Sequence, residues 1–356
     1  MEKQNRVMEN YVSFFNKATG MYMRTGVLDN EGKDTGKDVF MARYPELIDV
    51  GIMGHCIHGS KGLCIKSGVQ CYQSGLRVQK PNMSVEDFRK IAEESKGKVY
   101  QIALGGRGDP DMHENFEEIL KICVENDIVP NFTTSGLGMT EEKAALCKKY
   151  CGAVAVSEYR QPHTYKAIDM LLKAGVITNI HYVLGNNSID EAIKRLENKD
   201  FPKGINAIIF LLHKPIGQGE MSNVLKADDE RVKRFFEIIS DNRFDFQIGF
   251  DSCSVPGLIN YSRNIASASV DTCEGARWSM YISADMVAYP CSFDQAGRWS
   301  YDIKEDSIEN AWFSDQFEDF RNSFRNSCKG CKDRESCMGG CPISREIVLC
   351  NRACRK

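Results

Sequence analysis

The sequence predicts an α/β protein in which a partial (β/α)6 barrel of the TIM type precedes a small, irregular, cysteine-rich domain. Between about residues 46 and 253, short apolar runs alternate with amphipathic ones. After residue 254 the alternation stops, and the chain becomes rich in Cys, Gly, Ser, Asn and Arg. We therefore expect an N-terminal segment over 1–45, a barrel over 46–253 and a cysteine-rich domain over 254–356, which the length of 356 residues accommodates.

Seven apolar runs are the expected strands of the barrel. Several of them are near-continuous in Val, Ile, Leu and Ala, which is typical of parallel strands buried on both faces. They predict one parallel sheet. The runs are Glu46–His55, Lys98–Gly106, Val129–Gly136, Ala153–Tyr159, Thr178–Gly185, Ala207–Lys214 and Phe246–Cys253.

Helix patterns lie between these runs. Ser84 to Asp87 resembles a capping box, which predicts a helix start. Glu117–Asn126 and Tyr165–Ala174 each place apolar residues on one face, and Gly175 stands where a C-terminal glycine belongs. Repeated strand–helix units imply right-handed crossovers, and sites in such barrels lie at the carboxyl ends of the strands.

The composition excludes several classes of protein. The net charge is −3 and the pI about 6.1, so nothing points to nucleic acid or to an anionic membrane as a partner. No apolar run is long enough to span a bilayer, and no signal-peptide core follows the N-terminus. We expect a cytoplasmic protein, in which 15 cysteines favour metal ligation or catalysis over disulfides.

The last part of the chain carries a dense cysteine cluster. Cys328, Cys331, Cys337 and Cys341 are followed by Cys350 and Cys354, with small or polar residues between them. Short, turn-rich groups of thiolates are typical of metal or iron–sulfur ligation. This half has one short helix pattern, Ser307–Phe313, and is too irregular for a large apolar core, so we expect it to fold around its inorganic centres.

A second cysteine group follows the first expected strand. Cys56, Cys64 and Cys71, with Tyr72 after them, would hold three irons of a [4Fe–4S] cluster and leave the fourth open to a chelating ligand. The group resembles the loop of the radical SAM family, whose usual motif is Cys-x3-Cys-x2-Cys with an aromatic residue nearby. The spacing departs from that motif, because Gly68 occupies the usual middle position and Cys56 would supply the missing thiolate. His55 and His58 are further candidate ligands.

The ends of the next strands resemble segments of the same family that bind S-adenosylmethionine. Gly105, Gly106, Arg107, Gly108 and Asp109 resemble its Gly-Gly-x-Gly-Glu-Pro segment, with Asp109 where Glu is common. The resemblance implies that the backbone here holds the methionyl ammonium. Ser135 and Ser157 lie in strand-end segments that resemble contacts to the carboxylate or ribose, for which an ordinary loop is the alternative. Tyr72 completes the expected cofactor site.

The C-terminal domain resembles the SPASM extension of radical SAM enzymes, which carries two auxiliary [4Fe–4S] clusters. Cys273 and Cys291 fit its opening pair, and Ile282–Cys291 resembles its hairpin, with Met286 where Gly is usual. The resemblance implies a distal cluster on Cys328, Cys331, Cys337 and either Cys350 or Cys354. It implies a nearer cluster on Cys273, Cys291 and Cys341, completed by Cys253 or left with an open iron. For the last cysteine run alone, zinc is an alternative.

The resemblance implies three [4Fe–4S] clusters, bound S-adenosylmethionine, and hydrogen abstraction from a peptide residue by a 5′-deoxyadenosyl radical. The expected product is a crosslink or other modification in a ribosomal peptide. A flavodoxin or ferredoxin would be the reductant. Because only about 45 residues precede the first strand, we also expect either a separate protein that recognises the leader peptide or a substrate that needs no leader.

Two other functions stay open. One is oxidation of Cys or Ser in a sulfatase-like protein, although Ser292 follows Cys291 where such enzymes usually carry Asp, and Asp294 lies two residues further on. The other is a non-catalytic iron–sulfur electron carrier. Cys123, Cys147 and Cys151 fall on helix patterns and are expected in the core. Four isolated histidines are expected to be structural: His113, His163, His181 and His213.

Overall fold

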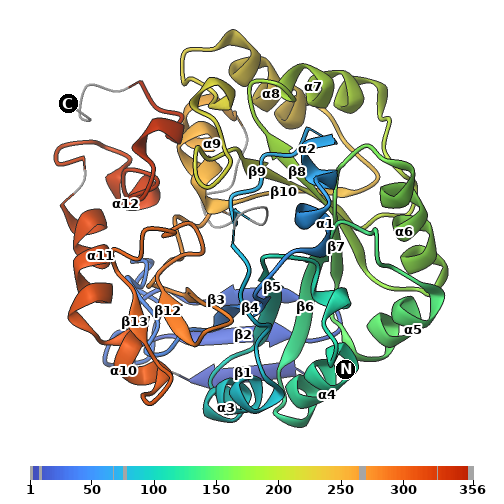
Figure 1. Ribbon diagram of the computed structural model, residues 1–356. Helices are drawn as coiled ribbons and strands as arrows, with labels where there is room; N and C mark the ends of the chain where they lie inside the picture. The colour runs from blue at the N-terminus through green and yellow to red at the C-terminus, as the bar shows by residue number, and fades with distance from the viewer. Residues whose placement is uncertain are drawn as a thin grey trace.

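The structure is a computed structural model that describes residues 3–7, 10–66, 68–74, 78–263, 270–326 and 328–351. Its main feature is a curved ten-stranded sheet in the order β10-β9-β8-β7-β6-β5-β4-β11-β12-β13. Figure 1 shows this sheet with helices along its outer side and two short helices, α1 and α2, on its inner side. None of the helices in the described part of the chain is long and apolar enough to span a bilayer.

Seven consecutive strands, β4 to β10, form the parallel part of the sheet, and the predicted partial barrel is confirmed. Each lies within one of the seven apolar runs, because a strand buried on both faces needs an apolar side chain at nearly every position. The strands are β4 (Leu47–Met53), β5 (Gln101–Gly106), β6 (Val129–Thr134), β7 (Val154–Ser157), β8 (Thr178–Leu184), β9 (Ala207–Leu212) and β10 (Gln247–Phe250).

The outer helices follow the strands in alternation. The predicted start at Ser84 is confirmed, since its hydroxyl accepts a hydrogen bond from the Asp87 backbone N–H at 3.1 Å. Gly175 has a φ of +75° just after α6, as a C-terminal glycine does. The helices are α3 (Val85–Ser95), α4 (Phe116–Glu125), α5 (Glu141–Tyr150), α6 (Pro162–Lys173), α7 (Ile189–Asn198) and α8 (Glu230–Asp241). Cys123 and Cys147 are fully buried beneath them and Cys151 is half-buried, as expected.

The N-terminal segment, which the sequence left unassigned, contains a three-stranded antiparallel sheet of β1 (Lys3–Val7), β2 (Val12–Asn16) and β3 (Met21–Arg24). Arg24 attaches this sheet to the C-terminal half of the chain. Its guanidinium makes two hydrogen bonds to Asp271, at 2.6 and 2.7 Å, and lies 4.1 Å from the centre of the Trp278 ring.

The C-terminal half continues the barrel sheet. β11 (Ser279–Ile282) pairs in parallel with β4 and antiparallel with β12 (Val287–Tyr289), which pairs with β13 (Tyr301–Asp302). The predicted hairpin is thus present, and Met286 occupies its turn with a φ of +61°, a conformation that favours glycine. The remaining helices are α1 (Ile57–Ser60), α2 (Leu63–Lys66), α9 (Val255–Tyr261), α10 (Ile308–Trp312), α11 (Asp315–Arg325) and α12 (Arg334–Cys337). The 3-10 turns lie at Pro110–Met112, Met221–Asn223, Ser252–Ser254 and Arg345–Ile347.

The expectation that this half lacks a large apolar core is wrong. Trp312, Phe317, Phe320 and Phe324 are buried and belong to the same core as the barrel strands. The three phenylalanines recur on one face of α11, whose first turn is capped by the Ser314 hydroxyl. This helical spacing is present in the sequence, but the surrounding Asp, Gln, Glu and Arg residues conceal it in the composition.

Candidate functional site

A cavity of about 470 Å³ occupies the inside of the barrel toward the carboxyl ends of the strands. Strands β4 to β9 each contribute to its wall, and Asp251 follows β10. All eight residues predicted to bind a cofactor line it. They are Tyr72, Gly105, Gly106, Arg107, Gly108, Asp109, Ser135 and Ser157.

The three cysteines of the loop after β4 also line this cavity, although seven and six residues separate them along the chain. Cys56 caps α1, where its sulfur accepts a hydrogen bond from the Gly59 backbone N–H at 3.1 Å. A hydrogen bond from the Cys64 thiol lowers the pKa of Cys56 to about 6, despite burial. The same hydrogen bond and burial raise the pKa of Cys64, and the charge of Cys71 raises it further. The three cysteines remain the predicted ligands of the first cluster.

Asp109 connects this cysteine loop to the ends of two strands. Its carboxylate accepts hydrogen bonds from the Ser135 backbone N–H at 2.8 Å and from the Ser135 hydroxyl at 2.5 Å. Its other contact is the Nε2 atom of His58, at 3.1 Å, and this hydrogen bond raises the pKa of His58. His58 therefore lies in the cavity wall beside the cysteines. His55 instead places its Nδ1 atom 3.3 Å from the Lys80 carbonyl oxygen.

The glycines at the end of β5 have two different roles, close packing and access to a ligand. A Cβ atom on Gly106 would lie 2.5 Å from the Met53 carbonyl oxygen, and its φ is +115°. A Cβ atom on Gly108 would lie 2.8 Å from the His55 carbonyl oxygen. Both glycines therefore permit β5 to pack against the end of β4. Gly105 has nothing within 4 Å of that position, so its backbone is open to a ligand in the cavity.

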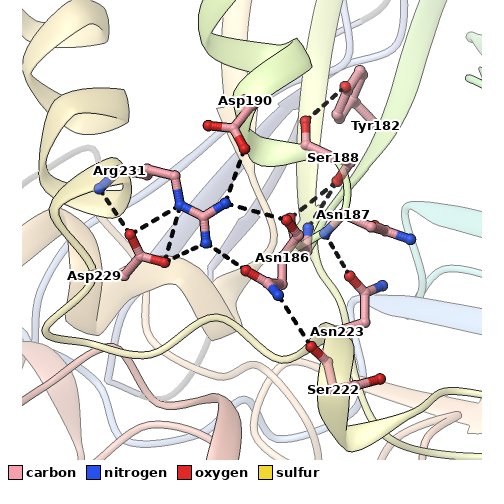
Figure 2. Close-up of polar contacts among 10 residues, drawn as sticks. Tyr182, Asn186, Asn187, Ser188, Asp190, Ser222, Asn223, Asp229 and Arg231 are labelled. Carbon is pink, nitrogen blue, oxygen red and sulfur yellow. Dashed lines mark hydrogen bonds and ion pairs between the residues drawn. The ribbon is translucent and has the colours of Figure 1, made fainter.

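A polar network around Arg231 joins Asp190, Asn186 and Asp229 and reaches Asn223 (Figure 2). Arg231, at the start of α8, bonds to Asp190 at 2.9 Å and to the side-chain oxygen of Asn186. The Asn186 backbone N–H donates to the Asn223 carbonyl oxygen at 2.9 Å. The Asn223 amide in turn donates to Gln70, directly before Cys71, at 3.5 Å. Residues distant in sequence thus position the cysteine loop.

Several residues of the cavity wall were not predicted. His163, His181 and His213 line it, whereas His113 bonds to the Met83 carbonyl oxygen at 3.1 Å. Burial lowers the pKa of His181 to about 4, so this imidazole is neutral at pH 7. The remaining unpredicted residues include Asp49, Glu158, Tyr159, Lys214, Asp251, Tyr281 and Phe293. The only sequence signal for Asp49, Lys214 and Asp251 is a charged residue within or at the end of an apolar run.

Asp49 on β4 is a carboxylate without a described hydrogen-bond or ion-pair partner. Its side chain is partly exposed, and it lines the cavity beside Tyr72 and Tyr281. Burial raises its pKa to about 6. An unpaired carboxylate with this pKa gains or loses a proton easily near neutral pH, as a general base or acid does.

We expect Asp49→Asn to stabilise the protein at pH 7. An unfolded Asp titrates near pH 4, so the folded protein binds this proton more tightly and its stability falls as the pH rises from about 4 to about 6. Removing the ionised carboxylate should raise the free energy of unfolding at pH 7 by roughly 3 kcal/mol. Urea unfolding at pH 4.5 and pH 7 measures this, with exposed Asp241→Asn as the control. An equal gain at both pH values would contradict it.

A second group of four cysteines lies where the C-terminal domain meets the barrel. A hydrogen bond with the Cys341 thiol, together with burial, raises the pKa of Cys253. Burial raises the pKa of Cys273 and of Cys291, and the charge of Cys253 raises the pKa of both thiols further. Cys253 therefore joins the three cysteines that the sequence predicted for the nearer cluster.

A third group lines a separate small cavity of about 20 Å³ under α9. Its members are Cys328, Cys331, Cys337 and Cys350, which are the predicted ligands of the distal cluster with one of the two candidates for the last position. Cys354, the other candidate, lies outside the described residues.

Thiols are the donors of iron–sulfur clusters, and a set of four also suits zinc. In the described part of the chain, no three His, Cys, Asp or Glu side chains surround one point as ligands of a single metal ion do.

Comparison with known proteins agrees with the sequence resemblance for the overall fold and for one segment of the C-terminal half. Residues 273–333 match the model of the SPASM family, an iron–sulfur cluster-binding domain. The chain is similar to SuiB of Streptococcus suis bound to S-adenosylmethionine, with a TM-score of 0.66 and 16% identity over 88% of this chain and 78% of SuiB.

Two further solved structures have the same fold. SuiB bound to its precursor peptide SuiA superposes with a TM-score of 0.67 and 13% identity, over 99% of both chains. The enzyme anSMEcpe with bound AdoMet superposes with a TM-score of 0.60 and 16% identity, over 85% of this chain and 87% of that one. At these identities the likeness establishes the fold, and the ligand set of the cysteine loop stays a prediction.

Proposed function

We propose that this protein is a radical SAM enzyme that abstracts a hydrogen atom from a peptide residue and so installs a crosslink or other modification in a ribosomal peptide. The observation that carries the proposal is the convergence of Cys56, Cys64 and Cys71 with the glycine segment of β5 in one cavity. The fold shared with SuiB, whose structures hold S-adenosylmethionine or the peptide SuiA, supports this function.

The three cysteines would hold a [4Fe–4S] cluster with one open iron. Once reduced, this cluster would supply the electron that cleaves S-adenosylmethionine to methionine and the 5′-deoxyadenosyl radical. The protein binds and orients the cofactor through the open backbone at Gly105. The hydrogen bonds of Asp109 to Ser135 and His58 fix the position of that backbone relative to the cysteine loop. The surrounding strands restrict the access of water to the cavity.

We also propose that the two further thiol groups each hold an auxiliary cluster. Cys328, Cys331, Cys337 and Cys350 would hold the distal one. The nearer one would have four protein ligands, with Cys253 as the fourth, because its thiol hydrogen-bonds to that of Cys341. A cluster with four thiolates has no iron free for substrate, which favours electron transfer over substrate anchoring as its role.

Oxidation of a Cys or Ser residue in a protein substrate is the second candidate, and the shared fold of anSMEcpe is the observation that favours it. The position of Asp294 argues against it. This carboxylate is buried and accepts hydrogen bonds from the backbone N–H groups of Arg298 at 3.1 Å and Trp299 at 2.9 Å. A carboxylate used in this way is poorly placed to act as the base of that reaction.

Anaerobic reconstitution with iron and sulfide tests the proposed function. With dithionite, or with flavodoxin or ferredoxin as the reductant, we expect cleavage of S-adenosylmethionine to 5′-deoxyadenosine. With a short peptide encoded beside its gene, and a leader-recognition protein if one is present, we expect a change in peptide mass. Iron binding without formation of 5′-deoxyadenosine would instead support the non-catalytic electron carrier.

A further inference from the structure

Arg107 is an unpaired cation in the wall of the barrel cavity. It directly follows β5, and its side chain is half-buried and lines the cavity. Among the residues that the structure describes, none forms a hydrogen bond or an ion pair with its guanidinium, and the Nε atom is buried without an acceptor. A guanidinium stays charged and has five N–H donors. Because a buried donor without an acceptor costs free energy, an anionic ligand at this place would be stabilising.

The carboxylates of the cavity wall do not supply this anion. Four of them line the cavity, and three already have a basic partner: Asp251 with Lys214 at 2.7 Å, Glu158 with Arg195 at 3.1 Å, and Asp109 with His58 at 3.1 Å. The fourth is Asp49, which lies opposite Ala103 in the pairing of β4 with β5. Ala103 is four residues before Arg107, which is about 13 Å along a strand. The guanidinium thus has no partner in the described wall.

The strand that carries Arg107 leaves room for a ligand beside it. On β5, Ile102 and Leu104 are buried, and Ala103 and Gly105 alternate with them on the face that lines the cavity. Neither has a large side chain, and a Cβ atom on Gly105 would meet nothing within 4 Å. A ligand can therefore approach the guanidinium along this face of the strand.

The end of β5 stays with β4 and not with β6. Its pairing with β6 ends at Leu104, opposite Phe132, whereas its pairing with β4 continues to Gly106, opposite Met53. The Arg107 backbone N–H then donates to the Met53 carbonyl oxygen at 2.9 Å. Arg107 is therefore fixed on the β4 side of its strand.

This position separates Arg107 from the predicted cofactor contacts. Ser135 and Ser157 belong to the ends of β6 and β7, on one side of β5, whereas β4, β11 and β12 lie on the other side. Tyr281 of β11 lines the cavity on that second side, and its hydroxyl occupies the space where a side chain at Gly51 of β4 would lie. Burial raises the pKa of Tyr281, and the charge of Arg107 opposes this rise. A ligand at the guanidinium would thus lie toward the C-terminal half, beside the predicted cofactor site.

We propose that Arg107 binds a carboxylate of the peptide substrate, either an Asp or Glu side chain or the C-terminal carboxylate. This inference rests on the proposed function, because it requires a peptide in the barrel cavity. The planar guanidinium can donate two parallel hydrogen bonds to a carboxylate, and such charge-assisted pairs are strong and directional. Arg107 would select a peptide with a carboxylate near the modified residue and hold it in one orientation.

The test measures the KM of the short peptide encoded beside the gene, with the reconstituted full-length chain, dithionite, and the leader-recognition protein if one is present. Arg107→Gln removes the charge and should raise this KM by roughly tenfold to a hundredfold, as expected for one hydrogen-bonded charge. Arg107→Lys keeps the charge without the planar fork, so its KM should lie between the two. The Kd of S-adenosylmethionine should rise by much less than the KM of the peptide.

Changes in the peptide identify the carboxylate. In one set of peptides each Asp or Glu is replaced in turn by Asn or Gln, and a further peptide has an amidated C-terminus. With the parent enzyme, we expect one of these peptides to show the same rise in KM as Arg107→Gln shows with the natural peptide. With Arg107→Gln that peptide should show no further rise, because the interaction is already lost.

Arg89→Gln is the matched control. Arg89 lies on α3, its side chain is exposed, it pairs with Glu118 at 3.5 Å, and it does not line the cavity. This variant should leave the KM of the peptide and the Kd of S-adenosylmethionine unchanged. Iron content and circular dichroism compare the folding of Arg107→Gln with that of the parent.

Modification of every amide-substituted peptide by the parent enzyme at an unchanged KM would overturn the inference and leave the proposed function intact, whether or not Arg107→Gln folds. Additive effects of the peptide change and Arg107→Gln would also overturn it. A Kd of S-adenosylmethionine that rises as much as the KM would assign the guanidinium to the cofactor, with the same consequence. Failure of the parent enzyme to modify the natural peptide would count against the proposed function and this inference together.

Discussion

Cys64→Ala is expected to reduce the formation of 5′-deoxyadenosine to background. Cys64 is the middle member of the three thiols that line the barrel cavity, and two thiolates do not retain a cluster that needs three. The iron content should fall by about four atoms per chain, while the clusters of the C-terminal domain remain. Iron analysis and chromatography of the S-adenosylmethionine cleavage products measure both effects.

Cys123→Ala is the matched control for this prediction. Cys123 lies on α4, is fully buried in the core and lines neither cysteine cavity. Its loss should lower stability by about 1 kcal/mol through the small space left behind, and should change neither the iron content nor the cleavage activity. Cleavage by Cys64→Ala at the rate of the parent protein would show that the ligand set is wrong, and His58 would then be the next residue to replace.

Arg321→Ala is expected to have the largest effect on stability, lowering the free energy of unfolding by about 4 kcal/mol. Arg321 lies on α11 and is 1% exposed. Its guanidinium donates hydrogen bonds to the carbonyl oxygens of Ala276 at 2.7 Å and Trp312 at 2.5 Å, and lies 5.0 Å from the Trp312 ring. Truncation leaves two buried carbonyl groups unpaired, at about 1–3 kcal/mol each, and opens a cavity.

Arg325→Ala, on the same helix, is the control for this prediction. Its side chain is 41% exposed, and its ion pair with Glu318 lies at the surface, so the loss should stay within about 1 kcal/mol. Urea unfolding under anaerobic conditions compares the two variants with the parent protein. A similar loss of stability in both would mean that the buried carbonyl groups find other donors.

Much of the fold could be predicted from the sequence because its signals are local. The seven strands lie within seven apolar runs, and the Ser84 cap and the glycine after α6 are visible in a few neighbouring residues. The N-terminal sheet was not predicted, although its strands pair with their neighbours in the chain, because this segment is polar and mixed in composition. The phenylalanines of α11 have a regular helical spacing, but the polar residues between them give this segment a polar composition.

The sequence by itself determined the chemistry of the site: thiols in three groups, a glycine segment at a strand end, and a parallel barrel to carry them. Cysteine spacing and apolar periodicity are properties of short segments, so they are readable without a structure. Only the tertiary structure decided which groups share a space. It joined Cys253 to Cys341, placed Cys350 with the distal cysteines, and set Asp49 and Lys214 in the wall of the barrel cavity, because burial and charge pairing depend on segments that meet only when the chain folds.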